Sequence, residues 1–174
     1  MSDTTPQDFD FDAWLDGAER PERSVTVYQK AGLIADLDAL EEQIQNAEAA
    51  EDLEPSLTEV GEARNLRAKY AKLAQQFHDS ALTIRVQGRT LEERAKLHAD
   101  NKDLEAVKLG AVVIADALVY PKATPQQVEK LKTVIGDAQF SRIVAAYNQA
   151  NNEFPVVSAD FLPKPSTRDD GGES

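Results

Sequence analysis

The side chains best suited to catalysis or metal binding are few in this sequence and stand apart from one another. His78 and His98 are the only histidines, and neither has a second histidine or a convergent set of carboxylates at the spacing of metal ligands. The 174-residue chain has no cysteine, which excludes disulfides, thiolate metal sites and cysteine nucleophiles. We therefore expect no metal site and no cofactor.

Neighbouring carboxylates are the remaining candidates for acid–base chemistry. They occur as the adjacent pairs Glu41–Glu42, Glu92–Glu93 and Asp169–Asp170. Adjacent residues of a helix point apart and cannot share a proton, and the last pair lies in a polar tail. Residues 100–103 resemble the start of a calcium loop, but the glycine and the closing glutamate are missing at their offsets. The sequence has no glycine-rich phosphate loop or serine elbow, so we predict that the protein is not an enzyme.

Charge and composition narrow the classes of partner. The net charge is −12, which disfavours nucleic acids and anionic membrane surfaces. The acidic N-terminus does not resemble a signal peptide, and no apolar stretch is long enough to span a bilayer. Hydrophobic residues make up 41% of the chain but aromatic residues only 6%, as in helical bundles. We expect a soluble, intracellular protein with an aliphatic core.

Two apolar stripes at heptad spacing dominate the first half of the chain. The first comprises Leu33, Leu37, Leu40, Ile44 and Ala47, and the second comprises Ala63, Leu66, Tyr70, Leu73 and Phe77. Each stripe lies on one face of a helix. The helix expected at 33–54 is acidic, whereas the helix expected at 57–79 carries Arg64, Arg67, Lys69 and Lys72. Together, on either side of Pro55, they predict an antiparallel helical hairpin with a buried seam and paired flanking charges.

Short strands are expected on both sides of this hairpin. Residues 24–28 and 81–87 alternate between apolar and polar side chains, with Val25 and Val27 on one face and Leu82, Ile84 and Val86 pointing inward. Both segments meet the base of the hairpin, so they should pair as a two-stranded antiparallel ribbon. An isolated ribbon is only marginally stable. It therefore needs the C-terminal helices beneath it, or a third strand from another molecule.

The second half of the chain predicts a helical bundle. Capping boxes at Thr90–Glu93 and Thr124–Gln127 start helices at 91–99 and 125–135, and Gly136 separates the latter from a last helix through Ala150. Residues 104–119, which Asp103 can cap, should form the central helix, although their β-branched run also suits a buried strand. The fold class is therefore mainly α, with segments 1–23 (acidic and aromatic), 24–152 (one helical domain) and 153–174 (an extended, disordered tail).

Apolar groups at the two ends of the chain are the candidate protein-binding residues. They are Phe9, Phe11 and Trp14 near the N-terminus, and Phe154, Val156, Val157, Phe161 and Leu162 near the C-terminus. Both sets are flanked by charge and could add to a ribbon edge or lie in a partner's groove. The alternative is packing on their own domain, which we favour for the N-terminal set because large apolar groups seek burial.

The order of segments resembles a known family, the tail assembly chaperones of long-tailed bacteriophages that infect actinobacteria. The resemblance rests on residues 9–44, on residues 80–86 followed by a helix, and on the segments 136–140 and 145–148. It implies a protein that binds the tape measure protein in the host cytoplasm, helps recruit tail-tube subunits and is absent from the mature virion. The family often has a longer, frameshifted form.

Two other function classes remain open from the sequence. The chain could be a structural tail or connector subunit that stays in the virion, or an inhibitor that mimics DNA through its negative charge. Mimicry needs carboxylates along one continuous face, whereas here they concentrate between residues 36 and 54 opposite a basic helix. We therefore prefer the hypothesis of a tail assembly chaperone. Whether the protein forms a homo-oligomer is left open.

Overall fold

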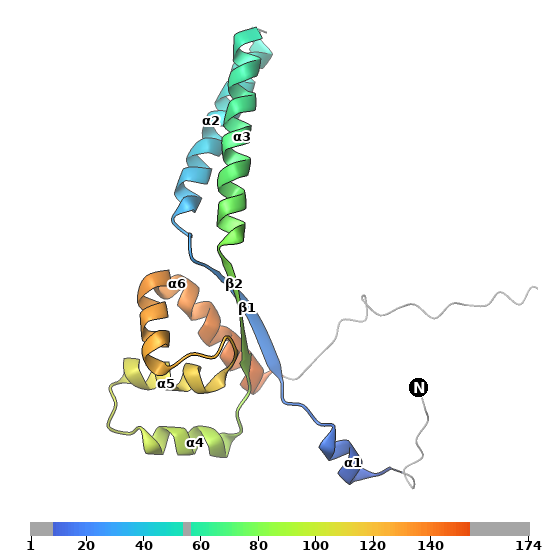
Figure 1. Cartoon of the computed structure of the whole chain (residues 1–174), viewed down its shortest axis with the longest axis vertical. Helices are drawn as coiled ribbons and strands as arrows, with labels where there is room; N and C mark the ends of the chain where they lie inside the picture. Colours follow the sequence, from blue (N-terminus) through green and yellow to red (C-terminus); the bar gives the residue numbers. More distant parts are fainter. Residues whose placement is uncertain (1–8, 54–56, 154–174) are drawn as a thin grey trace, which may run out of the picture.

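The fold is mainly helical and includes a small antiparallel sheet. The computed structural model describes residues 9–53 and 57–153. In that part of the chain the elements are, in order, α1 (Phe11–Asp16), β1 (Glu22–Tyr28), α2 (Leu33–Leu53), α3 (Leu57–Asp79), β2 (Ala81–Gln87), α4 (Leu91–Asp100), α5 (Ala106–Ala117), β3 (Leu118–Tyr120) and α6 (Pro125–Asn152). Figure 1 shows α2 and α3 as a long projection, with the sheet and the helices α4, α5 and α6 at its base and α1 apart from them. The prediction of a mainly helical chain is confirmed.

The sheet has three strands in the order β1-β2-β3. β1 and β2 pair antiparallel, with Val25 opposite Ile84, so the predicted pairing of these segments is confirmed. The prediction of only two strands is wrong, because Leu118–Tyr120 adds to β2 as a third strand. Residues 118 and 119 were expected to end the central helix. β2 offers an unpaired edge at this point, and an extended backbone can use that edge for hydrogen bonds.

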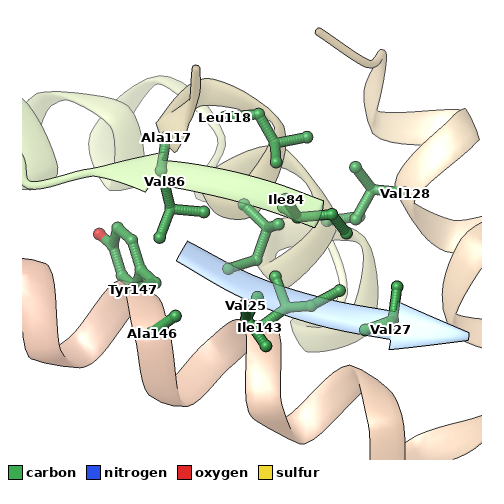
Figure 2. Packing of buried hydrophobic residues seen from close by; sticks show 12 residues of the cluster. Val25, Val27, Ile84, Val86, Ala117, Leu118, Val128, Ile143, Ala146 and Tyr147 are labelled. Atoms are coloured by element: carbon green, nitrogen blue, oxygen red, sulfur yellow. The ribbon is translucent and has the colours of Figure 1, made fainter. Parts of the chain in front are cut away.

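One face of the sheet is buried by α5 and α6. Figure 2 shows side chains of β1 and β2 meeting those of α6, among them Ile143 and Tyr147. The buried cluster comprises Val25, Val27, Ile84, Val86, Ala111, Ile114, Ala117, Leu118, Val128, Ile143, Ala146 and Tyr147. The predicted support of the ribbon by C-terminal helices is thus present. The third strand comes from the same chain, so the sheet needs no strand from another molecule for its core.

Two glycines shape α6 and its contact with the sheet. Gly136 has φ +80° and ψ 163°, a conformation that other residues rarely adopt, and it kinks α6 where a helix end was predicted. Gly88 follows β2, and a Cβ atom there would lie 2.5 Å from the carbonyl oxygen of Ala150. The absence of a side chain at Gly88 therefore lets the end of α6 approach the sheet closely.

We call α2 and α3 the α2–α3 arm. The two helices run in opposite directions and pack against each other along their length (Figure 1). The ten stripe residues all lie on the protected sides of these helices, but only Ala63 is fully buried and the other nine are half-buried. Arg67 of α3 forms an ion pair with Glu48 of α2. The predicted break at Pro55 lies outside the described residues.

Several predicted boundaries need correction in the C-terminal half. The central helix begins at Ala106, and its N-cap is Glu105 rather than Asp103. It ends at Ala117, where the chain turns into β3. The capping boxes at Thr90 and Thr124 are confirmed, since each threonine side chain accepts a hydrogen bond from the backbone three residues later and the box is reciprocal. The two reciprocal capping boxes thus located their helix starts, whereas the single capping candidate Asp103 and the apolar pattern misplaced the start and the end of α5.

Candidate interaction surface

The histidines do not form part of a larger polar site. His78 lies at the end of α3 with its ring edge-on to Phe77, at 5.6 Å between ring centroids. His98 is exposed in the last turn of α4. Within residues 9–53 and 57–153, no group of three or more His, Asp or Glu side chains is arranged to hold a metal ion.

The aromatic residues near the N-terminus are exposed. Phe9, Phe11 and Trp14 are 51%, 59% and 56% exposed, and the last two stack with 6.0 Å between ring centroids. Asp10 caps α1 through a hydrogen bond that its side chain accepts from the Ala13 N–H at 3.1 Å. This cap and the short helix place the three rings together. Our preferred expectation, that they pack on the domain, is wrong, because all three side chains are more than half exposed and α1 lies apart from the body in Figure 1.

Acidic residues flank these rings along the chain. Asp10, Asp12, Asp16 and Glu19 are all exposed. Arg20, in the segment that follows α1, forms an ion pair with Glu93 at 2.8 Å and so ties this segment to α4. The N-terminal aromatic cluster, defined as Phe9, Phe11 and Trp14, is thus an apolar patch with an acidic rim. Such a patch suits insertion into an apolar groove with a basic border.

The C-terminal candidates lie outside the described residues. These are Phe154, Val156, Val157, Phe161 and Leu162. α6 ends at Asn152, two residues after Ala150, which lies beside Gly88 and Pro21. Their role in binding therefore stays a prediction.

A groove beside the base of the arm was missed by the sequence analysis. It has a volume of about 570 Å³ and is lined by residues that include Val27, Leu82, Leu131, Val134 and Ile135. Leu82 was predicted to point into the core, but it is 37% exposed, whereas Ile84 is 1% exposed. The helical cover ends between these two residues. A signal was present, because Val134 widens the apolar stripe that Val128, Leu131 and Ile135 already form on this helix.

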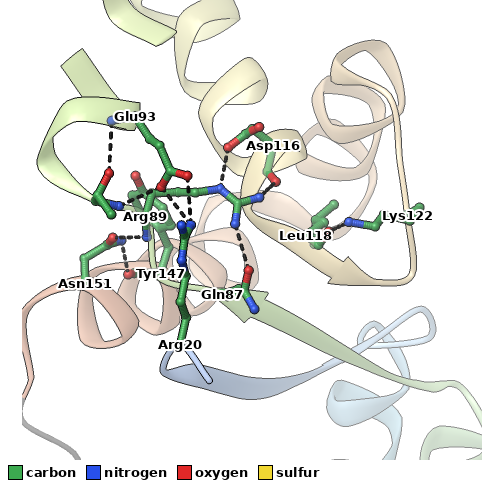
Figure 3. A network of polar contacts seen from close by, with 10 residues as sticks. Arg20, Gln87, Arg89, Glu93, Asp116, Leu118, Lys122, Tyr147 and Asn151 are labelled. Carbon is green, nitrogen blue, oxygen red and sulfur yellow. Dashed lines mark hydrogen bonds and ion pairs between the residues drawn. The ribbon is translucent and has the colours of Figure 1, made fainter. Parts of the chain in front are cut away.

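A polar network holds the end of α6 against the sheet, as Figure 3 shows. The Arg89 side chain donates hydrogen bonds to the Asp116 carboxylate at 2.7 Å and to the Gln87 side chain at 3.0 Å. The backbone N–H of Arg89 donates a hydrogen bond to the Asn151 side chain at 2.7 Å. Asn151 in turn donates to the carbonyl oxygen of Tyr147 at 2.7 Å. These contacts join β2, α5 and α6, so the network acts as a structural clamp.

Two side chains around this network have shifted pKa values. The backbone hydrogen bond from Thr90 lowers the pKa of Glu93, and the Arg20 guanidinium lowers it further. Burial raises the pKa of Tyr147 above its ordinary value. Glu93 is therefore ionised and Tyr147 protonated at neutral pH, which are the states that their structural contacts require.

Comparisons with known proteins identify no relative. No protein-family model, curated protein or solved structure matches this chain. No helix in the described part of the chain is both long enough and apolar enough to cross a membrane. A function must therefore be inferred from the chain's own surfaces.

Proposed function

We propose that this protein is a non-enzymatic tail assembly chaperone of a long-tailed bacteriophage. It binds the tape measure protein, helps recruit tail-tube subunits in the host cytoplasm, and is absent from the mature virion. The observation that carries the proposal is the exposed N-terminal aromatic cluster with its acidic rim. The resemblance in segment order adds the identity of the client.

The physical properties of the surface suit this role. A tape measure protein is a long helical chain that aggregates when its apolar faces are exposed, so shielding it requires apolar contacts from a soluble partner. Large exposed rings supply such contacts at a small cost in side-chain entropy. A net charge of −12 on each bound copy would keep a coated filament soluble through mutual repulsion.

The proposal also assigns roles to the α2–α3 arm and to the helices α4, α5 and α6. The α2–α3 arm acts as a helical hairpin that keeps an acidic face in solvent, formed by Asp38, Glu41 and Glu42, all of which are exposed. The helices α4, α5 and α6 act as the C-terminal bundle that supports the sheet. In this arrangement the acidic face carries the charge that limits aggregation, while the N-terminal aromatic cluster contacts the client, with the C-terminal candidates as a second contact.

Co-expression with the tape measure protein tests the function directly. The wild-type chain should raise the amount of soluble tape measure protein, and the double variant Phe11→Ala/Trp14→Ala should lower that amount several-fold. Leu91→Ala is the matched control, because Leu91 is also a large exposed apolar residue, at 76%, but lies on α4. Circular dichroism of each variant checks that the fold is retained.

The outcomes separate the proposals. If the wild-type chain does not keep the tape measure protein soluble, the chaperone function is wrong. If the double variant and a chain lacking residues 153–174 both work as well as wild type, the binding surface lies elsewhere, and the acidic face of α2 is the next candidate. Detection of the protein in purified particles by mass spectrometry would instead favour a structural tail or connector subunit.

A further inference from the structure

The free edge of β1 is the feature that carries a further inference. β1 is the outer strand of the sheet, so β2 covers only one of its sides. The N–H of Gln29 donates to the carbonyl oxygen of Ser80 at 3.0 Å, and the N–H of Gly88 donates to that of Pro21 at 2.9 Å. The N–H and C=O groups of successive residues in a strand point in opposite directions, so the backbone groups of odd-numbered residues of β1 point toward β2. The backbone N–H and C=O groups of even-numbered residues, including Ser24 and Thr26, point away from β2.

A side chain already closes one end of this edge. The amide of Gln139, in α6, accepts a hydrogen bond from the Tyr28 N–H at 2.7 Å and donates one to the Tyr28 carbonyl oxygen at 3.0 Å. A carboxamide carries the same donor and acceptor as a peptide unit, so Gln139 takes the place of a neighbouring strand. The outward N–H and C=O groups of Ser24 and Thr26 have no such partner within residues 9–53 and 57–153.

The course of α6 brings the end of the described chain to the open part of this edge. Gln139 lies at the Tyr28 end of β1, whereas Ala150 packs on Gly88, next to Pro21 at the start of the strand. The second half of α6 therefore runs antiparallel to β1 beneath it, as Figure 2 shows. The chain that follows Glu153 starts beside Pro21, and a reversal of direction would carry it along β1.

The sequence after α6 has the pattern of a strand of the required length. Pro155 and Pro163 bracket residues 156–162, a run of seven that matches the seven residues of β1. Prolines are tolerated at strand ends but cannot donate within a ladder, so they define the limits of the segment. Val157, Ala159 and Phe161 alternate with Ser158 and Asp160, which gives the segment one apolar face.

We propose that residues 156–162 of the same chain add to the free edge of β1 as a parallel fourth strand. The backbone of this segment pairs with the outward groups of Ser24 and Thr26, and Gln139 marks the end of the paired stretch. The added strand covers an edge that would otherwise pair with other molecules. A partner that extends the sheet must first displace this segment. The inference concerns the isolated protein and does not depend on the proposed function.

Amide hydrogen exchange measured by NMR tests the pairing. In the full chain the amides of Ser24 and Thr26 should exchange at least about tenfold more slowly than in a chain ending at Glu153. The amides of Val25 and Val27, which point toward β2, are internal controls and should keep their protection in both chains. Equal exchange at Ser24 and Thr26 in the two chains would overturn the proposal.

Proline variants make the test specific to the segment. The double variant Ser158→Pro/Ala159→Pro removes two consecutive donors from the middle of the proposed strand, one of which must point toward β1, and should reproduce the exchange of the shortened chain. Ser166→Pro/Thr167→Pro is the matched control beyond the segment and should behave as the full chain. Protection at Thr26 that survives the Ser158→Pro/Ala159→Pro variant would contradict the assignment, as would protection that falls on dilution together with a dimeric mass, since the occupant would then be a second copy.

Discussion

The sheet core and the α2–α3 arm are built by different means. In the core, Ile84, Val86 and Ile143 are at most 1% exposed and touch side chains from several elements. In the arm, nine of the ten stripe residues remain half-buried, because two helices alone can cover only one side of each other. A residue of the core should therefore contribute more, on average, to the free energy of unfolding than a residue of the arm. The arm displays a long surface supported by a single seam.

This contrast bears on function. A two-helix projection with one protected face presents its other faces to solvent, and on α2 these faces are acidic. Removing part of its seam should loosen the arm while leaving the sheet and its helices folded. The predictions that follow compare equivalent changes in the two regions.

The largest expected effect is in the core. Ile143→Ala should lower the free energy of unfolding by about 3 to 4 kcal/mol, since it leaves a cavity at a fully buried position. Thermal and urea unfolding followed by circular dichroism measure the loss. A cost below about 1 kcal/mol would show that α6 is not held against the sheet as described.

Glycine replacements should have opposite signs in the two regions. Gly88→Ala should cost about 2 kcal/mol, because its Cβ would lie 2.5 Å from the backbone oxygen of Ala150. Gly61→Ala in α3 should stabilise by about 0.5 to 1 kcal/mol, because nothing lies within 4 Å of the added methyl group and alanine favours helix. Urea unfolding of both variants gives the comparison. A stabilising Gly88→Ala would contradict the close approach of α6.

The seam of the arm should be less sensitive than the core. A fully buried leucine replaced by alanine costs about 2 to 5 kcal/mol, but Leu40 and Leu73 are half-buried, so Leu40→Ala and Leu73→Ala should each cost about 1 to 2 kcal/mol. Amide exchange should then increase in α2 and α3 and stay unchanged in β2. No change in exchange or in melting temperature would mean that these side chains face a partner or solvent.

The smallest expected effect is electrostatic. The pKa of Glu93 is lowered in the folded state, so its ionised form stabilises the protein at neutral pH, and this contribution is lost as the pH falls below the ordinary glutamate value of about 4.3. Glu93→Gln should therefore lower the melting temperature slightly at pH 7, and its difference from the wild type should shrink as the pH falls below the ordinary glutamate pKa. Arg20→Gln, which removes the partner in the ion pair, should act in the same direction. A larger loss for Glu93→Gln at low pH than at pH 7 would contradict this account.

The candidate surface shows how far sequence reasoning reached. The types and spacing of Phe9, Phe11 and Trp14 marked them as binding candidates, but the same residues also suited burial. Their exposure depends on whether the folded body offers a matching groove, and no local pattern contains that information. The groove at Leu82 was missed for the same reason, since strict alternation assigns Leu82 and Ile84 to one face without saying where the helical cover ends.

Sequence alone determined the features that arise within a few residues. The capping boxes at Thr90 and Thr124, the interruption at Gly136 and the pairing partners of β1 follow from local hydrogen bonds, backbone sterics and two-residue alternation. Only the tertiary structure decided that Leu118–Tyr120 leaves the helix to join β2, and that α1 stays apart from the body. Both outcomes depend on which distant surface is available, because an apolar segment gains its stability from whatever partner the rest of the fold brings to it.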